Sequence, residues 1–309
     1  MSDYPEYKFL PDESVEDGIK RIALGLTEKA LSDIDDTEMN VHETVHEARK
    51  RCKEIRGLIR ITRPSFEETY KFENAWYRDT AKELSYVRDS QSIIESFDKL
   101  IDHYEDIDED QFLSIREKFV ERRDQIAEDK GTLENLLGNF RRRIEQGRSR
   151  VDNWSLKKKD FKAFKEGFKK TYRRGRKAMP KSYQSPTAEN FHEWRKRVKY
   201  HWYHIRLLQS SSERLLGDIE REVHLLADYL GDDHDLAVLK STLLADPGAY
   251  ADMNKIHDFI YLTDKRSLEL RDNAKPLGEK IYSDKPKWKV NRFRNYWEAW
   301  KRNNRAETK

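Results

Sequence analysis

Apolar residues recur every three or four positions along most of the chain, the spacing that places them on one face of an α-helix. The first such stretch opens at Asp12 or Ser14, either of which is a candidate N-cap, and carries Val15, Ile19 and Ile22. We find no convincing alternation of polar and apolar residues with the period of two that marks a half-buried strand. The pattern therefore predicts an all-α protein.

Proline and short polar runs divide this pattern into separate helices. We expect one helix to end at Pro64 and another at Pro180, and the long helical pattern over 66–103 to break near Asp89. Residues 231–244 fit either a helix or a turn. Two or three more helices should follow the turn at 246–248. The other predicted helices cover residues 11–34, 41–61, 109–130, 132–151, 156–179, 191–208 and 213–230.

Composition agrees with long, solvated helices. Charged residues make up 39% of the 309 residues, the mean hydropathy is −1.02, and there are only 12 Gly and 8 Pro. The single cysteine, Cys52, excludes an intrachain disulfide, and we expect it to be a small buried side chain. Residues 1–18 lack a basic segment followed by an apolar run, and no window approaches a membrane span. A cytoplasmic protein is the resulting prediction.

Basic and acidic residues nearly balance, 61 against 58, but they are unevenly distributed. Residues 141–206 contain 22 Lys or Arg against 6 Asp or Glu, whereas residues 93–139 contain 14 acidic residues against 6 basic ones. Such segregation predicts that one surface of the protein is built for an anion.

The chain resembles itself when it is shifted by 146 residues. Between 46–60 and 192–206, eight of fifteen residues are identical, whereas unrelated segments would share about one. The same shift aligns Asp89 with Asp235 without a gap. We therefore predict an internally duplicated chain that forms two four-helix bundles related by a pseudo-twofold axis. The two bundles are predicted to cover residues 1–152 and 153–309.

The repeated segment places a stripe of cations on one face of each helix. At about 3.6 residues per turn, positions offset by 0, 3, 4, 7 and 14 line up over roughly 21 Å of helix axis. Trp194, Val198, Ile205 and Leu208 occupy the opposite face, which we expect to be buried. Such a repeated stripe indicates a site for a linear polyanion. The stripes consist of His46, Arg49, Lys50, Lys53 and Arg60 in the first half and His192, Arg195, Lys196, Lys199 and Arg206 in the second.

The segments "HEARKRCK" and "HEWRKRVK", the "LGDDHDLAVL" segment, the "GFKKTYRRGRKAM" helix and "AKPLGEKIY" near the end resemble the CHAD family, named for its conserved histidines and α-helical fold. The resemblance spans residues 14–300, nearly the whole chain. It implies two four-helix bundles about a pseudo-twofold axis with a basic, histidine-containing central channel or cleft. Members bind inorganic polyphosphate, and some associate with polyphosphate granules. The resemblance therefore implies polyphosphate as the ligand and granules or polyphosphate-metabolising enzymes as possible partners.

The resemblance and the stripes together assign residues to that channel. Asp89, Asp235 and His234 are expected to support it, the aspartates through an ion pair or a helix cap that holds the basic helices. The first half departs from the family pattern at "YVRDS" and at Glu54, where a further cation is common. The predicted polyphosphate-binding residues are His46, Arg49, Lys50, Lys53, Arg56, Arg60, Arg173, Arg174, Arg176, His192, Arg195, Lys196, Lys199 and Arg206.

An enzymatic alternative starts from the adjacent His234 and Asp235. A metal-dependent phosphohydrolase uses such imidazole and carboxylate ligands. Against it, the duplication aligns His234 with Arg88, which cannot bind a metal, and Glu47 and Glu193 lie off the stripes. We therefore predict no metal, no cofactor and no catalysis. The further ligands would have to come from His192, His201, His204 or His224 and from Asp246 or Asp258.

Nucleic acid is the alternative partner, since basic helices can follow a phosphate backbone and aromatic residues can stack on bases. However, the aromatic residues follow the apolar side of the helix, and no nucleic-acid recognition motif is evident. His201 and His204 lie among these aromatic residues and are expected to be packing residues. A scaffold that binds another protein through the acidic surface at 98–110 is compatible with polyphosphate binding. The aromatic residues in question are Trp194, Tyr200, Trp202 and Tyr203.

Overall fold

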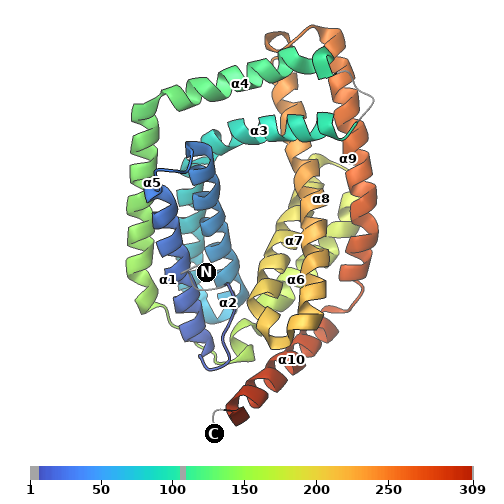
Figure 1. Cartoon of the computed structure of the whole chain (residues 1–309). Coiled ribbons are helices and arrows are strands. Elements are labelled where there is room, and N and C mark those ends of the chain that lie inside the picture. Colours follow the sequence, from blue (N-terminus) through green and yellow to red (C-terminus); the bar gives the residue numbers. More distant parts are fainter. Residues whose placement is uncertain (1–6, 105–108, 308–309) are drawn as a thin grey trace.

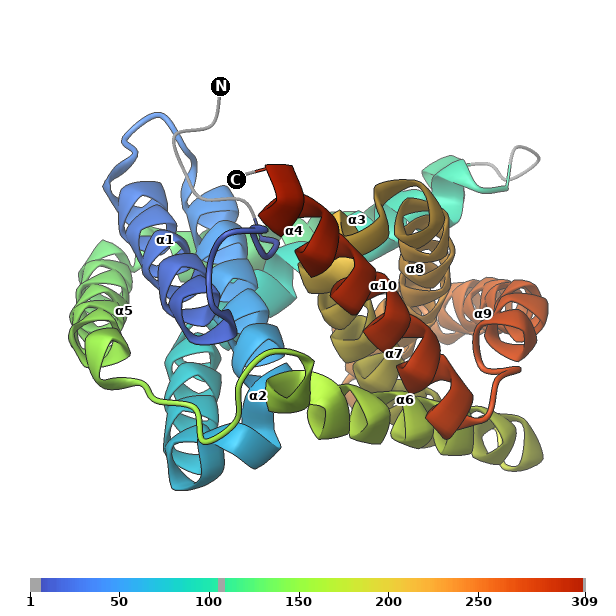
Figure 2. The same ribbon diagram turned by 90° about the horizontal axis from the view of Figure 1, so that it is seen from below.

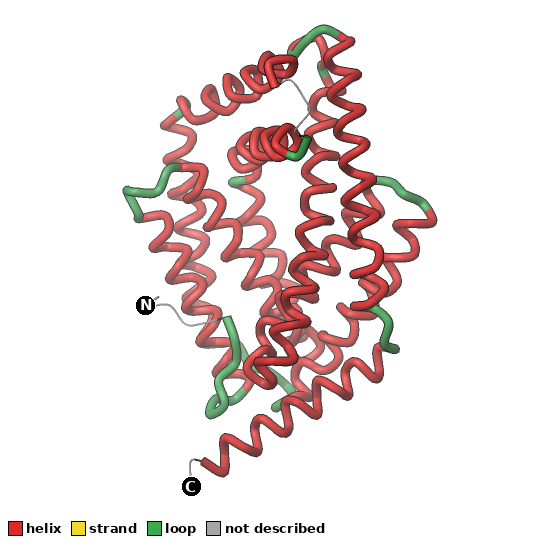
Figure 3. Tube along the Cα trace, turned by 45° about the vertical axis from the view of Figure 1, so that its right-hand side comes forward, coloured by secondary structure: helices red, strands yellow, loops and turns green. Residues whose placement is uncertain are grey.

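The computed structural model describes residues 7–104 and 109–307, and within these residues it contains helices and no strand (Figures 1 and 3). The all-α prediction is confirmed. Residues 105–108 of the predicted acidic surface lie outside the described residues. The helices are α1 (Val15–Asp35), α2 (Val41–Glu83), α3 (Ser85–Asp102), α4 (Leu113–Glu128), α5 (Lys130–Arg150), α6 (Phe161–Gln184), α7 (Ala188–Leu208), α8 (Glu213–Ala245), α9 (Met253–Ile281) and α10 (Pro286–Glu307).

The helices form two groups joined at one end. Helices α1, α2 and α5 pack together on one side, and α6, α7, α8 and α9 pack in succession on the other (Figure 1). Helices α3 and α4 run across the top of Figure 1, where α3 packs against α8. Helix α10 packs on α6 and lies across the opposite end of the molecule (Figure 2). Helix α2 also packs against α6 and α7, so it is the main contact between the two groups.

Polar caps fix where the important helices begin. Ser14 caps α1, as the sequence suggested, by accepting a hydrogen bond from the amide of Asp17. Asn40 and Glu43 form a reciprocal capping box at the start of α2. Thr187 caps α7. These caps satisfy backbone amides that have no partner within the helix and so fix where each helix begins.

Of the two proline boundaries, the one at Pro64 lies close to a break and the one at Pro180 was predicted wrongly. Element α2 spans Val41–Glu83, but two helical parts meet in it at a kink at Glu67, three residues after Pro64, where φ is 45°. The two parts lie side by side, because Arg49 donates a hydrogen bond to the carbonyl oxygen of Ala81. Helix α6 continues past Pro180 to Gln184. A proline removes one backbone hydrogen bond, but buried residues on both sides, Met179 and Ser182 in α6, keep the chain helical there.

The break expected near Asp89 lies instead at Leu84, between α2 and α3. In the second half, residues 231–244, predicted as a helix or a turn, belong to the uninterrupted helix α8. The helix starts nevertheless keep the spacing of the sequence repeat: α1 begins at Val15 and α6 at Phe161, 146 residues later.

The apolar side chains lie where the helical pattern placed them. Trp194, Val198, Ile205 and Leu208 are all buried, so the predicted packing face of α7 is confirmed. Cys52 is buried as well, and this burial raises the pKa of its thiol to about 12. An inert, apolar role for this cysteine follows.

A separate hydrophobic cluster joins α3 and α4 to α8 and α9. The rings of Phe97 on α3 and Phe259 on α9 stack with their centroids 5.0 Å apart. Ile115 and Phe119 of α4 pack into the same cluster. Apolar side chains from residues before and after 152 therefore share one core.

Candidate functional site

Helices α2 and α7 approach most closely where Gly57 meets Tyr203. A Cβ atom added to Gly57 would lie 2.8 Å from the Cβ of Tyr203, so only glycine permits this contact. Close by, Arg206 of α7 forms an ion pair of 2.9 Å with Glu54 of α2. This close packing fixes the stripes of the two helices relative to each other.

Four cations from the two stripes converge beside this contact: Arg49 and Lys53 from α2 with Arg195 and Lys199 from α7. The Lys53 side chain is exposed, yet desolvation by the surrounding protein and the charges of Arg49, Arg195 and Lys199 lower its pKa to about 8. Burial also lowers the pKa of Lys199. We refer to these four residues as the central cation cluster. A cluster of like charges that water still reaches attracts an anion.

Two aspartates partly balance the half-buried arginines of this cluster. Burial lowers the pKa of Arg49, and the negative charge of Asp89 acts against this decrease. Burial raises the pKa of Asp235, and the positive charge of Arg195 acts against this increase. Arg49 also donates a hydrogen bond of 2.6 Å to the carbonyl oxygen of Ala81. This arrangement agrees with the supporting role predicted for the aspartates.

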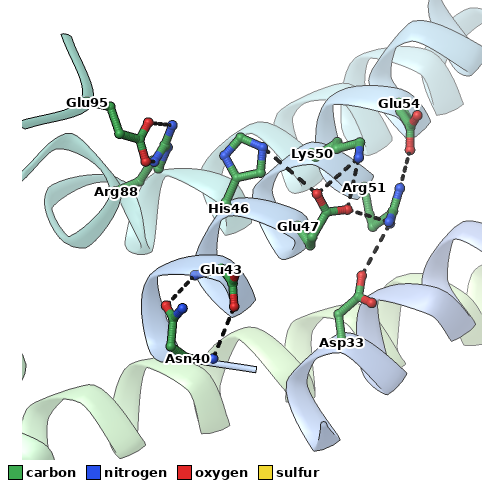
Figure 4. Close-up of polar contacts among 10 residues, drawn as sticks. All are labelled: Asp33, Asn40, Glu43, His46, Glu47, Lys50, Arg51, Glu54, Arg88 and Glu95. Carbon is green, nitrogen blue, oxygen red and sulfur yellow. Dashed lines mark hydrogen bonds and ion pairs between the residues drawn. The ribbon is translucent and has the colours of Figure 1, made fainter. Parts of the chain in front are cut away.

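The predicted histidines lie at the edge of the cluster. The Nδ1 atoms of His192 and His234 are 3.2 Å apart. Burial and the charge of Arg195 lower the pKa of His234 to about 3, so this imidazole is neutral at pH 7. His46 is exposed, and its Nε2 lies 3.9 Å from a carboxylate oxygen of Glu47 (Figure 4). The histidines of the two halves therefore have different neighbours.

Lys50 and Lys196 are engaged by acids. Glu47 accepts hydrogen bonds from Lys50 at 3.0 Å and also from Arg51 (Figure 4). The equivalent residues of the second half, Glu193, Lys196 and Arg197, pair in the same way. In the central cluster, Lys199 also has an acidic neighbour, because its Nζ lies 3.7 Å from a carboxylate oxygen of Asp228.

A second group of cations, which includes the predicted Arg173 and Arg174, lies where α6 meets α2. Gly167 of α6 lies directly against the backbone of Arg60 and Ile61, and Lys170 and Arg174 follow on α6 about one and two turns later. The charge of Arg63 is the main cause of a lowered pKa at Lys170. We call this second group the α6 patch. It consists of Arg63, Lys170, Arg173, Arg174 and Arg197.

Three members of the α6 patch, Arg63, Lys170 and Arg197, were not predicted as site residues. Arg63 could have been found, because it continues the stripe of α2 beyond Arg60. Arg176, which was predicted, points elsewhere: its Nε donates a hydrogen bond of 3.0 Å to the carbonyl oxygen of Tyr282, at the end of α9.

The predicted His46 has a second histidine beside it, His42, for which no role was predicted. His42 and His46 are one helical turn apart and line a cavity of about 830 Å³ with Arg88 and Arg123. The sequence "HETVH" has the spacing of a zinc-binding pair with an intervening glutamate. Here Glu43 is used in the capping box with Asn40 (Figure 4). Within residues 7–104 and 109–307, no three His, Cys, Asp or Glu side chains are grouped so as to hold a metal ion.

The fold and this site define a helical protein in which two basic helices cross and bring their cations together. A model of the CHAD domain matches residues 26–244, more than half of the chain, and the protein therefore belongs to the CHAD family. The match includes both striped helices. No significant match to a curated protein was found. None of the helices in the described part of the chain is long and apolar enough to cross a membrane.

Proposed function

We propose that this protein binds inorganic polyphosphate at the central cation cluster and does not catalyse its conversion. The observation that carries the proposal is the convergence of Arg49, Lys53, Arg195 and Lys199 from two helices. Desolvation and, after it, the charges of Arg49, Arg195 and Lys199 lower the pKa of Lys53 to about 8, and a bound polyanion would offset the repulsion among these cations. Membership of the CHAD family, which is linked to polyphosphate, supports the same ligand.

A linear ligand fits this site better than a single phosphate. Cations extend along α2 from Arg49 to Arg63, fourteen residues or about 21 Å of helix axis. Each phosphate of a chain can therefore meet a different cation, and binding releases the counterions of the chain. Affinity should rise with chain length and fall steeply with salt.

An internal duplication belongs to this proposal. Gly57 and Tyr203 occupy equivalent positions and are in contact. Beside them, Glu54 pairs with Arg206. The residues equivalent to these two, Tyr200 and Arg60, are also in contact, with the Arg60 guanidinium 3.9 Å from the centroid of the Tyr200 ring. Likewise Asp89 faces Arg49 as Asp235 faces Arg195. Contacts that recur between positions 146 residues apart support two bundles, over 1–152 and 153–309, related by a pseudo-twofold axis.

The alternatives find less support in the same contacts. A divalent cation at His234 and Asp235 would face the positive charges of Arg195, Lys196 and Lys53. The aromatic residues of α7 are poorly placed to stack on bases, because Trp194 and Tyr203 are buried, Arg60 covers Tyr200, and the indole nitrogen of Trp202 donates to Glu220. We propose a cytoplasmic location, with polyphosphate granules as one setting.

Competition binding at physiological salt tests the proposal. Labelled long-chain polyphosphate is bound to the protein and challenged with single-stranded DNA, duplex DNA and RNA at equal phosphate concentration. The products are then analysed on the same samples. We expect polyphosphate to be retained against all three competitors and to remain intact. Displacement by nucleic acid would mean a generic basic surface, and shortened polyphosphate would direct attention back to His234 and Asp235.

A further inference from the structure

The cations of α2 form a continuous line that extends beyond the central cluster. Their spacings along the helix, of four, three, four and three residues, keep them on one face. In the middle of the line, Asn74 accepts hydrogen bonds from Arg56 at 3.5 Å and from Arg60 at 2.9 Å. The line is thus held in place between its two ends. It consists of Arg49, Lys53, Arg56, Arg60 and Arg63.

The far end of this line is the α6 patch. Lys170, Arg173 and Arg174 are exposed on α6, and Arg63 lies beneath them at the junction with α2. Arg197 of α7 adds a cation from the third helix, although it is shared with Glu193 at 2.8 Å. Three helices therefore direct positive charge to one place on the surface.

Arg63 has Tyr70 as a hydrogen-bonding neighbour, but no carboxylate pairs with it in the part of the chain that the structure describes. Its Nε and Nη2 atoms are buried and make no hydrogen bond within the described residues. Its pKa is lowered to about 10, mainly by burial, and the neighbouring charges of Arg60 and Arg174 act in the same direction. An arginine held among cations without a carboxylate costs stability, which an anionic ligand would offset.

The equivalent line on α7 is not basic. Where α2 has Arg56 and Arg63, α7 has Trp202 and Gln209. The one arginine that remains beyond the contact of the two helices, Arg206, is paired with Glu54 at 2.9 Å. An anion leaving the central cluster along α7 would therefore meet an aromatic ring and a neutralised arginine.

We propose that a polyphosphate chain bound at the central cation cluster leaves it along α2 and continues onto the α6 patch, and not along α7. This inference rests on the proposed function. It adds a second segment of the binding site and gives the bound chain a defined direction. Short chains occupy the central cluster alone, whereas long chains reach the patch as well.

The test compares two double variants with polyphosphates of two lengths. Lys170→Ala with Arg174→Ala removes two exposed cations of the patch. The control, Arg221→Ala with Lys280→Ala, removes two cations whose side chains are 72% and 67% exposed on α8 and α9. Because all four residues are exposed, the variants should fold, and circular dichroism verifies this.

For long-chain polyphosphate, we expect the patch variant to lose about tenfold in affinity and its log–log salt slope to fall by about 0.7 for each lost contact, as for single-stranded nucleic acid. For a chain of a few phosphates, the change should be less than about twofold. The control should behave as wild type with both ligands. Adding Arg63→Ala should lower only the long-chain affinity further.

Equal long-chain affinity of the patch variant and the control would overturn the inference and leave the proposed function intact. An equal loss for short and long chains would also overturn it, because the patch would then be the primary site. Failure of the wild-type protein to bind either polyphosphate would instead refute the proposed function itself.

Discussion

The two helices that cross at Gly57 and Tyr203 carry the same cations before the crossing and different residues after it. Before it, the arginine and lysine of one half have identical equivalents in the other. After it, α2 remains basic, whereas α7 carries one arginine that Glu54 neutralises. The difference shows that a helix position can be kept by the fold while its charge is free to change. The residues compared after the crossing are Arg60 and Arg63 on α2 and Arg206 and Gln209 on α7, and the difference begins one residue before it, with Arg56 on α2 and Trp202 on α7.

A second contrast between the halves lies inside the core. Ile55 on α2 is fully buried, and the position 146 residues later is His201, which is also fully buried. The His201 ring packs near Phe168 and Tyr172, with centroids 5.5 and 5.4 Å away. His201 is thus a packing residue, as predicted, but neither of its ring nitrogens has a hydrogen-bond partner among the described residues, whereas one such bond was expected. The first half thus has an aliphatic side chain at a buried position where the second half has a titratable imidazole ring.

Breaking the part that both halves share should have the largest effect. Replacing Arg195, Lys196 and Lys199 with alanine should weaken polyphosphate binding by about 100-fold, because several phosphate contacts are lost together. The matched variant of the first half, with Arg49, Lys50 and Lys53 replaced, should lose a similar amount. Binding isotherms measure the loss, and circular dichroism tests that the helical content is unchanged. Unchanged affinity in both variants would place the site elsewhere.

The buried histidine should make the second half the acid-sensitive one. The pKa of His201 is about 3 in the folded protein, well below its ordinary value, so on acidification the unfolded state takes up the proton first. Stability is therefore retained above about pH 6.5 and falls by about 1.4 kcal/mol per pH unit below it, or roughly 2 kcal/mol at pH 5. His201→Ile, which introduces the residue of the first half, should remove this part of the pH dependence.

Urea unfolding at pH 7 and pH 5 measures the effect of this substitution. His257→Ala, at an exposed histidine, is the control and should leave the pH dependence as in wild type. If His201→Ile and wild type lose equal stability between the two pH values, another group is responsible for the acid sensitivity.

Lys53 should make binding sensitive to alkaline pH. With a pKa of about 8 in the free protein, Lys53 is charged at pH 7 and mostly neutral at pH 9. Bound polyphosphate favours the charged form, so affinity should fall as pH rises, by up to about tenfold between pH 7 and pH 9. Lys53→Arg keeps the charge at both pH values and should flatten the profile. A profile equally steep in the variant would assign the titration to another residue.

The smallest expected effect comes from making α7 resemble α2. Glu54→Gln frees Arg206, and Gln209→Lys adds a cation at the position equivalent to Arg63. Each change should raise long-chain affinity by about threefold, as expected for one added phosphate contact. Thermal unfolding of each variant checks that the loss of the buried Glu54 carboxylate has not loosened the helix pair. Unchanged affinity in the combined variant would mean that α7 cannot accept the chain for reasons other than charge.

Much of this molecule follows from its sequence because helices are local structures. The period of the apolar residues gave the helices, and the repeated stripe led to Arg49, Lys53, Arg195 and Lys199, which the structure brings together. The continuation of α6 past Pro180 could not be predicted, since tertiary packing overrides a local preference there.

The α6 patch was missed for a different reason. Arg63 and Lys170 are far apart in the chain, and they meet because Gly167 lets α6 lie against the backbone of α2. A sequence pattern along one helix shows which face is charged. It does not show which cation of another helix will face it.

The cluster that joins α3 and α4 to α8 and α9 has a consequence for biosynthesis. Phe97 and Phe119 cannot pack in this cluster until Phe259 has been synthesised. The ribosome adds Phe259 about 10 s or more later, at 5–20 residues per second. Until then, a newly made first half presents unpaired apolar surface to the cell. We therefore expect this half to require chaperone protection, or to aggregate when it is produced alone. The chain can bury this apolar surface within itself only after α9 has left the ribosome.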